Sequence, residues 1–506
     1  MRRTGHGRGV DDRGERAALL AQLADPGCPV CRTVDQATSR YLFWFATESF
    51  QEPETLARVR STLGMCPRHT RDLVKLGEAS VLTSVLRAVL PAAAARLAEP
   101  AGRPGCPACD SAARSADYQL GVIARLLDDQ TVVAAYRAAG GLCAAHTVQA
   151  LPSLPTRHAR LLVSILQHAM AAPPQGVSAV EALAGTDPDT TTRDHLRELL
   201  PSEPATPTSS SPGRATLERL HRLLEVAACP ACLAEGQSER RYLRWLAAGA
   251  DGGPADGSRG VPGPDELELC AQHLHDLEVA VPSAAQRAAA RLTGRWAALL
   301  EGCQARLARE ERLGSLAGRR SLARAAWTGG RDQRRVWTRR ARAAVAAFLG
   351  SRSRAREAAL AGLQAPWCRV CHAVAEDARS AAGLLLAALG DGPTARRYQA
   401  SHGLCVRHVL DLWADARAAP ARAVLLGRLD VLGWELAEAD RKQAWALRYQ
   451  PTGPEADAWL RAAAIVDGRV FLGGPARSLE PTRPGRLDGD RPLAARPPVD
   501  SAERRR

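Results

Sequence analysis

Cys28-Pro29-Val30-Cys31, followed by Gly64-Met65-Cys66-Pro67-Arg68-His69, is the stretch that decides how this chain folds. A CxxC pair is followed by a CxxH pair, and this order occurs four times with 33 to 37 residues between the pairs. Three thiolates and one imidazole are a standard donor set for a tetrahedral structural zinc ion. Twelve of the 13 cysteines belong to the pattern, so it predicts four metal sites rather than scattered core thiols.

We define a module as one CxxC pair and the CxxH pair that follows it, and we expect the two pairs of a module to bind one ion. Module by module, the predicted ligands are Cys28, Cys31, Cys66 and His69; Cys106, Cys109, Cys143 and His146; Cys229, Cys232, Cys270 and His273; and Cys368, Cys371, Cys405 and His408. Each set would hold one Zn²⁺, which makes four per chain.

Each ligand pair is expected at the start of a helix, because residues three apart on the first turn share one face. Proline follows the first cysteine in four of the eight pairs, as in Cys28-Pro29, and proline favours the first helical position. The positive end of the helix dipole then stabilises thiolate. Module four departs from this pattern with Cys368-Arg369.

The segments between the ligands carry apolar residues at helical spacing, and strand-like alternation is scarce. After His69, for example, apolar residues recur from Leu73 to Val89. The predicted fold class is therefore mainly α, with four helical modules each clipped by a Cys₃His site, a flexible linker and a disordered C-terminal tail. Metal binding on the order of 10 kcal/mol per site offsets the entropy of closing such long loops, so folding should depend on metal.

Pro- and Ser-rich stretches and charge runs set the expected segment boundaries. The predicted segments are an N-terminal extension (1–25), module 1 (26–100), module 2 (101–171), a flexible linker (172–213), module 3 (214–303), a basic helical insertion (304–364), module 4 (365–450), a C-terminal helix (451–472) and a disordered tail (473–506).

The formal net charge is +14, and most of the excess lies between Arg319 and Arg356, where twelve arginines face one acid, Asp332. Tryptophans interleave with these arginines, as they would on a surface for nucleic acid or an acidic partner. A solvated helix explains the same pattern and is favoured, because no nucleic-acid-binding motif accompanies the charge. The candidate contacts are Arg334, Arg335, Arg339, Arg340 and Arg342.

The N-terminus has no apolar signal region, so a reducing cytoplasm is the expected location and disulfides are not expected. The longest apolar candidates, near Ala381–Leu389, reach about half the length of a membrane span, so no span is expected. Histidines outside the pattern, among them His275 and His402, should be packed or solvated rather than ligands. His372, next to Cys371, should either support a metal ligand without binding the ion or lie at the surface. Cys303, the odd thiol, should be a small apolar residue in a helix.

Three other chemistries were weighed. Iron-sulfur clusters accept three cysteines and one histidine, although cluster ligands usually sit closer in sequence, and this alternative stays open. Cys368 to His372 matches a covalent haem motif, but the other modules lack the histidine after the second cysteine. No phosphate loop, dinucleotide glycine pattern, HExxH or nucleophile elbow occurs, so the sequence leans away from an enzyme.

The ligand order CPxC, a tyrosine-containing helix and then (G)-L/M-CxxH resembles a family of bacterial proteins of unknown function with paired knuckles of this kind. Cys28 to Cys31 and Gly64 to His69 carry the resemblance, and residues 454–462 are similar to a closing helix of that family. The resemblance implies metal binding and no activity. The expected function is therefore a non-enzymatic zinc-binding scaffold for an unidentified protein or nucleic-acid partner; the alternative is an iron-sulfur or other redox protein using the same ligands.

Overall fold

The computed structural model describes residues 8–77, 79–99, 105–185, 212–247, 269–325, 368–447 and 449–468. Within these ranges every regular element is a helix and no strand occurs. The predicted mainly α fold is confirmed.

All eight ligand pairs begin a helix, and the first cysteine is the residue immediately before it. Seven of these cysteines have extended backbone angles at the N-cap position; Cys368 is one of them, although no proline follows it. The eight helices are α2 (Pro29–Trp44), α4 (Pro67–Lys75), α6 (Pro107–Leu126), α8 (Ala144–Ala150), α13 (Pro230–Ala247), α14 (Ala271–Ala280), α17 (Arg369–Ala388) and α19 (Val406–Asp411).

The remaining helices connect these eight. They are α1 (Arg8–Leu23), α3 (Pro53–Ser61), α5 (Ala79–Ala98), α7 (Gln130–Ala138), α9 (Thr156–Ala171), α10 (Ala179–Ala184), α12 (Pro212–Leu224), α15 (Pro282–Ala325), α18 (Gly392–Ala400), α20 (Ala419–Lys442) and α21 (Ala458–Asp467). A π-turn, Phe45–Ser49, extends α2, and short 3₁₀ turns lie at Leu151–Ser153, Ala416–Ala418, Trp445–Leu447 and Pro454–Asp457.

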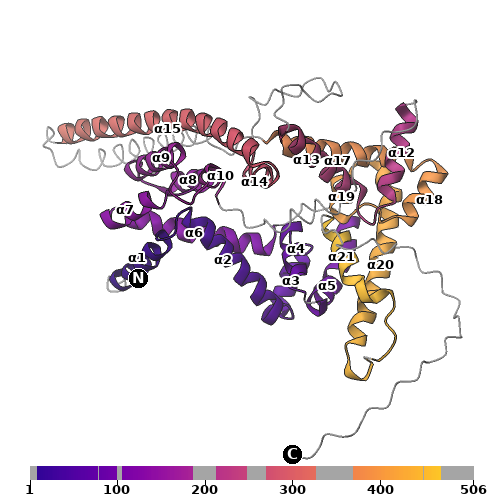
Figure 1. The fold of residues 1–506 in the computed structure, drawn as a ribbon. Helices are drawn as coiled ribbons and strands as arrows, with labels where there is room; N and C mark the ends of the chain where they lie inside the picture. Colours follow the sequence, from indigo (N-terminus) through magenta and orange to yellow (C-terminus); the bar gives the residue numbers. More distant parts are fainter. Residues whose placement is uncertain are drawn as a thin grey trace, which may run out of the picture.

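Two pairs of antiparallel helices, α2 with α6 and α13 with α17, run between two hydrophobic cores (Figure 1). Val30 at the start of α2 shares the first core with Ile123 near the end of α6. Phe45, just after α2, shares the second core with Ala108 at the start of α6. The first core also contains α7 to α10, α14 and α15, and the second contains α3 to α5, α12 and α18 to α21.

The described helices that carry the ligand pairs form two equivalent halves, α2, α4, α6 and α8 within residues 28–185 and α13, α14, α17 and α19 within residues 229–468. Tyr41 and Trp44 follow Cys28 by 13 and 16 residues, and Tyr242 and Trp245 follow Cys229 at the same offsets. The halves pack together in both cores, where α5 contacts α20 and α21 and α9 and α10 contact α15. The four modules of the sequence are thus organised as two pairs.

The described helices bear on three of the predicted segments. The N-terminal extension contains α1, whose Leu19 and Leu23 are buried in the first core. The first part of the predicted linker contains α10, which starts at a capping box formed by Ser178 and Glu181, so residues 172–185 are not a simple linker. The helix of module 3, α15, continues past residue 304 into the predicted basic insertion. The rest of the linker (186–211), residues 326–367 of the insertion and the tail from 469 lie outside the described residues.

One described helix, α5, is long and apolar enough to cross a membrane, so the expectation that no segment reaches that length was wrong. About 50% of its apolar window is buried inside the protein. It packs against α20 and α21, and Val85 and Val89 are among its buried side chains. These are the contacts of a core helix.

Candidate metal centres

The twelve cysteines and four histidines of the pattern meet in four clusters of four. We name them site A (Cys28, Cys31, Cys143 and His146), site B (Cys66, His69, Cys106 and Cys109), site C (Cys229, Cys232, Cys405 and His408) and site D (Cys270, His273, Cys368 and Cys371). All sixteen predicted ligands take part. The predicted pairing within a module was wrong: each CxxC pair joins the CxxH pair of the neighbouring module in the same half.

The helix pairs explain this crossing. With 16 residues, α2 is about 24 Å long, so the chain leaves site A and arrives at the far end of the α2–α6 pair. The next CxxH pair therefore lies beside the start of α6, where Cys106 and Cys109 are. After α6 has returned, the second CxxH pair meets the start of α2. The pair α13 and α17 repeats this path.

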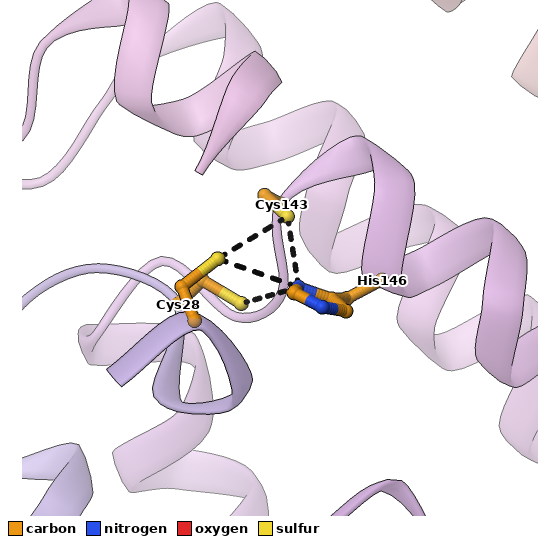
Figure 2. Close-up of side chains that lie close together, drawn as sticks. Cys28, Cys143 and His146 are labelled. Carbon is orange, nitrogen blue, oxygen red and sulfur yellow. Dashed lines mark hydrogen bonds between the residues drawn. The ribbon is translucent and has the colours of Figure 1, made fainter. Parts of the chain in front are cut away.

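The four donor atoms of each cluster surround one point. Figure 2 shows Cys28, Cys143 and His146 of site A directed toward each other. Sulfur–sulfur distances of 3.7 to 3.9 Å are found in all four sites. The distances from sulfur to the histidine Nδ1 are 3.2 to 3.5 Å.

These distances fit a single tetrahedral ion. Bonds of about 2.3 Å to sulfur and about 2.0 Å to nitrogen give tetrahedral edges of about 3.8 Å between sulfurs and about 3.5 Å between sulfur and nitrogen. A disulfide, at about 2.05 Å, would be far shorter, and every cysteine of the clusters is a free thiol. The donor set and its shape therefore suit a metal ion at each of the four points.

The histidines of the second half have carboxylate partners on α13. His273 approaches Glu239 with its outward Nε2 at 3.0 Å. The Nε2 of His408 lies 3.5 Å from Glu235, which also pairs with Arg407. Such partners orient a ligating imidazole and raise its basicity. Sequence reasoning missed both glutamates, although their places three and seven residues after Cys232 on one helix face were a usable signal.

Within the clusters, neighbouring ligands shift one another's pKa values. Burial opposes the charge of His146, but hydrogen bonds with Cys28 and Cys31 raise its pKa to about 10. Burial likewise opposes the positive charge of His408, but electrostatic attraction to Cys405 raises the pKa of His408 to about 9. Hydrogen bonds with Cys109 and Cys66 lower the pKa of Cys106 to about 3. A metal cation would take the place of the protons that these donors share, so metal binding should release protons.

Two buried tyrosines support the second ligand pair of each half. The hydroxyl of Tyr398 accepts a hydrogen bond of 3.1 Å from the backbone N–H of Leu404, the residue before Cys405. The hydroxyl of Tyr136 forms the equivalent hydrogen bond with the backbone of Leu142, the residue before Cys143. Each tyrosine precedes its cysteine by seven residues, a repeat that sequence reasoning did not use.

A glycine closes each of sites A and C. Gly185 follows α10 with a φ of +82°, and a Cβ there would lie 2.5 Å from the sulfur of Cys31. Gly468 follows α21 with a φ of +77°, and a Cβ there would lie 2.5 Å from the sulfur of Cys405. Both positions need glycine for their backbone angle and for the close approach. The carbonyl of Gly185 also accepts a hydrogen bond from His275 of the other half at 2.9 Å.

The other residues singled out by sequence take no part in a cluster. His372 lies at the surface, 3.7 Å from Glu376, so CxxCH does not form a separate site. His275 and Cys303 are buried in packed positions, as predicted. The five candidate arginines, Arg334, Arg335, Arg339, Arg340 and Arg342, lie outside the described residues.

Comparison of the chain with protein-family models, with curated proteins and with solved structures finds no match. The resemblance to bacterial proteins with paired knuckles therefore stands on the ligand pattern alone. The metal-binding clusters stand on their geometry.

Proposed function

We propose that the protein is a non-enzymatic zinc protein in which four structural Cys₃His sites hold a helical scaffold together. The observation that carries this proposal is the closure of each cluster: four protein donors at the edges of one tetrahedron leave no position for water or substrate. Catalysis by zinc needs such an open position. Each ion would also join distant helices, since site A links residues more than 100 apart in the chain.

The edge lengths favour a single ion over an iron-sulfur cluster. In a four-iron cluster each ligand binds a different iron, and in a two-iron cluster two ligands bind each iron, so some ligand atoms must be separated by a body of several atoms. In each of the four sites all four donor atoms lie within 4.8 Å of one another. Here the sulfurs of Cys66 and Cys109 are 3.7 Å apart, and those of Cys232 and Cys405 are 3.9 Å apart. This spacing supports zinc at all four sites.

Elemental analysis of the anaerobically purified chain tests the proposal. We expect about four zinc ions per chain, a colourless solution, and loss of helical circular dichroism when a strong chelator removes the metal. A brown protein containing iron and sulfide would contradict zinc occupancy and select the redox alternative. One zinc ion or none, with helicity unchanged by chelator, would contradict the structural role.

We propose that the scaffold acts by binding a macromolecular partner. Support for a protein partner comes from exposed aromatic side chains at the end of α20 and just beyond it: Trp434 is 66% exposed, Trp445 74% and Tyr449 80%. Large aromatic residues are enriched in protein interfaces. Nucleic-acid binding through the arginine-rich segment is the second candidate. It predicts an affinity that falls steeply with salt and is lost when Arg334, Arg335, Arg339, Arg340 and Arg342 are neutralised.

A further inference from the structure

The four metal centres divide into two classes by exposure. In sites A and C every cysteine is buried. In sites B and D one cysteine is exposed, namely Cys109 and Cys371, and a second is partly exposed, namely Cys66 and Cys270. The same difference appears in both halves, because site B occupies in the first half the position that site D occupies in the second.

The closing glycines give this difference a physical cause. Gly185 packs against the sulfurs of Cys31 and Cys143 in site A, and Gly468 packs against those of Cys405 and Cys232 in site C. In the described part of the chain no glycine approaches a ligand of site B or site D in this way. Cys109 and Cys371 lie at equivalent places in the two halves, in the first turn of α6 and of α17, and both are exposed.

We propose that Cys109 and Cys371 are sites of oxidation by peroxides, and that their oxidation releases the metal of sites B and D while sites A and C keep theirs. This inference rests on the proposed zinc occupancy. A metal-held cysteine is a thiolate, and the susceptibility of a thiolate to oxidation follows its exposure. A second thiolate lies within reach in both sites: the sulfurs of Cys66 and Cys109 are 3.7 Å apart, as are those of Cys270 and Cys371.

The reaction balances with one peroxide per site. The thiolate of Cys109 attacks hydrogen peroxide, a sulfur–oxygen bond forms, the oxygen–oxygen bond breaks and hydroxide leaves. The thiolate of Cys66 then attacks the sulfenic sulfur, the disulfide forms and a second hydroxide leaves. Two thiolates have lost two electrons, peroxide has become two waters after protonation, and the ion retains only His69 and Cys106. Cys371 and Cys270 follow the same course.

Sites A and C should resist because all of their cysteines are buried; those of site A are at most 8% exposed. Cys229, Cys232 and Cys405 are at most 1% exposed, and Gly468 covers two of them. Their helix starts belong to the hydrophobic cores, so exposing them would require a core to open. The cysteines of sites B and D should therefore be oxidised faster than those of sites A and C.

The test uses the full, unsubstituted chain with a known zinc content. Zinc is first measured after complete acid release. A second sample receives hydrogen peroxide, a colorimetric zinc indicator follows the released ion, and mass spectrometry of peptides locates the oxidised cysteines. We expect two of four ions to be released, with disulfides Cys66–Cys109 and Cys270–Cys371. A Cys303→Ala variant serves as control and should release zinc at the same rate, because Cys303 is buried and binds no metal.

The outcomes separate this inference from the proposed function. A chain without zinc in the acid measurement contradicts the function itself. A chain with four zinc ions that loses all four together, loses none, or forms its first disulfides among Cys28, Cys31 and Cys143 overturns the inference and leaves the function standing. Disulfides within sites B and D that join other pairs overturn the assigned partners.

Discussion

Gly468 lies directly on the sulfur of Cys405, so closely that a Cβ at this position would come within 2.5 Å of it. The glycine ends α21 and belongs to the closing segment of the second half, about 60 residues after the ligand that it covers. The C-terminal helix is thus part of site C, although it supplies no ligand.

Replacing this glycine should remove one metal ion. In Gly468→Ala the added methyl group collides with the sulfurs of Cys405 and Cys232, so we expect about three zinc ions per chain by elemental analysis. The matched control is Gly77→Ala, whose φ is +75° and whose Cβ meets nothing within 4 Å. It should keep four ions and lose only about 1–2 kcal/mol of stability from backbone strain. Equal zinc contents in the two variants would contradict the closing role.

Double substitutions distinguish the crossed pairing from pairing within a module. Cys28 and Cys143 belong to one site in the structure, so Cys28→Ser combined with Cys143→Ser should leave three intact sites. Cys28→Ser combined with Cys66→Ser disrupts sites A and B and should leave two. Pairing within a module predicts the reverse order of zinc contents, which makes the count decisive.

Tyr398→Phe should destabilise the protein without removing a ligand. The substitution leaves the N–H of Leu404 without its partner in a buried position, at a cost of about 1–3 kcal/mol. Tyr118→Phe is the control, because Tyr118 is 61% exposed and should change stability by less than about 0.5 kcal/mol. Urea unfolding at saturating zinc measures both. Equal effects would show that the Tyr398 hydroxyl does not support the site.

Glu239→Ala should weaken metal binding at site D. The carboxylate lies 3.0 Å from the Nε2 of His273, and loss of such a partner typically costs about 10- to 100-fold in metal affinity. Glu376→Ala removes a carboxylate beside His372, a histidine that binds no metal, and should leave all affinities unchanged. Competition with a chelator of known affinity measures the zinc affinity of site D in each variant. Site D affinities that agree within twofold between the two variants would contradict a role for Glu239.

The protein should be less stable at mildly acidic pH because protonation of His402 favours the unfolded chain. Burial, with a smaller contribution from the charge of Arg428, lowers the pKa of this histidine in the folded protein. The unfolded chain therefore binds a proton at higher pH than the folded one, so the contribution is present above about pH 6.5 and is lost as the pH falls below that value. Between pH 7.5 and 5.5 the free energy of unfolding should fall less for His402→Gln than for the unsubstituted chain, when both are measured at the same zinc concentration. His372→Gln, at an exposed position, should not change that loss.

The local structure around each ligand pair follows from the residues themselves. Cys28 and Cys31 are three apart and Pro29 follows Cys28, which favours a helix that begins at Pro29, and the structure has this helix. Gly64, two residues before the second pair, has a φ of +93°, a conformation that favours glycine. The donor set could also be predicted from the sequence, because twelve cysteines lie in CxxC and CxxH pairs that alternate along the chain, and few other chemistries use such a pattern.

The sequence by itself determined that the chain is helical, which sixteen side chains form groups that could hold metal ions, and that each pair begins a helix. Only the tertiary structure decided which pairs share an ion. The spacing of the ligands gives the number of residues between two pairs but not the direction in which the chain runs between them. The helices α2 and α6 each take the chain to the opposite end of the helix pair before the next CxxH pair. The burial of sites A and C was likewise decided by packing, because Gly185 and Gly468 reach their sulfurs only after both halves have folded back on themselves.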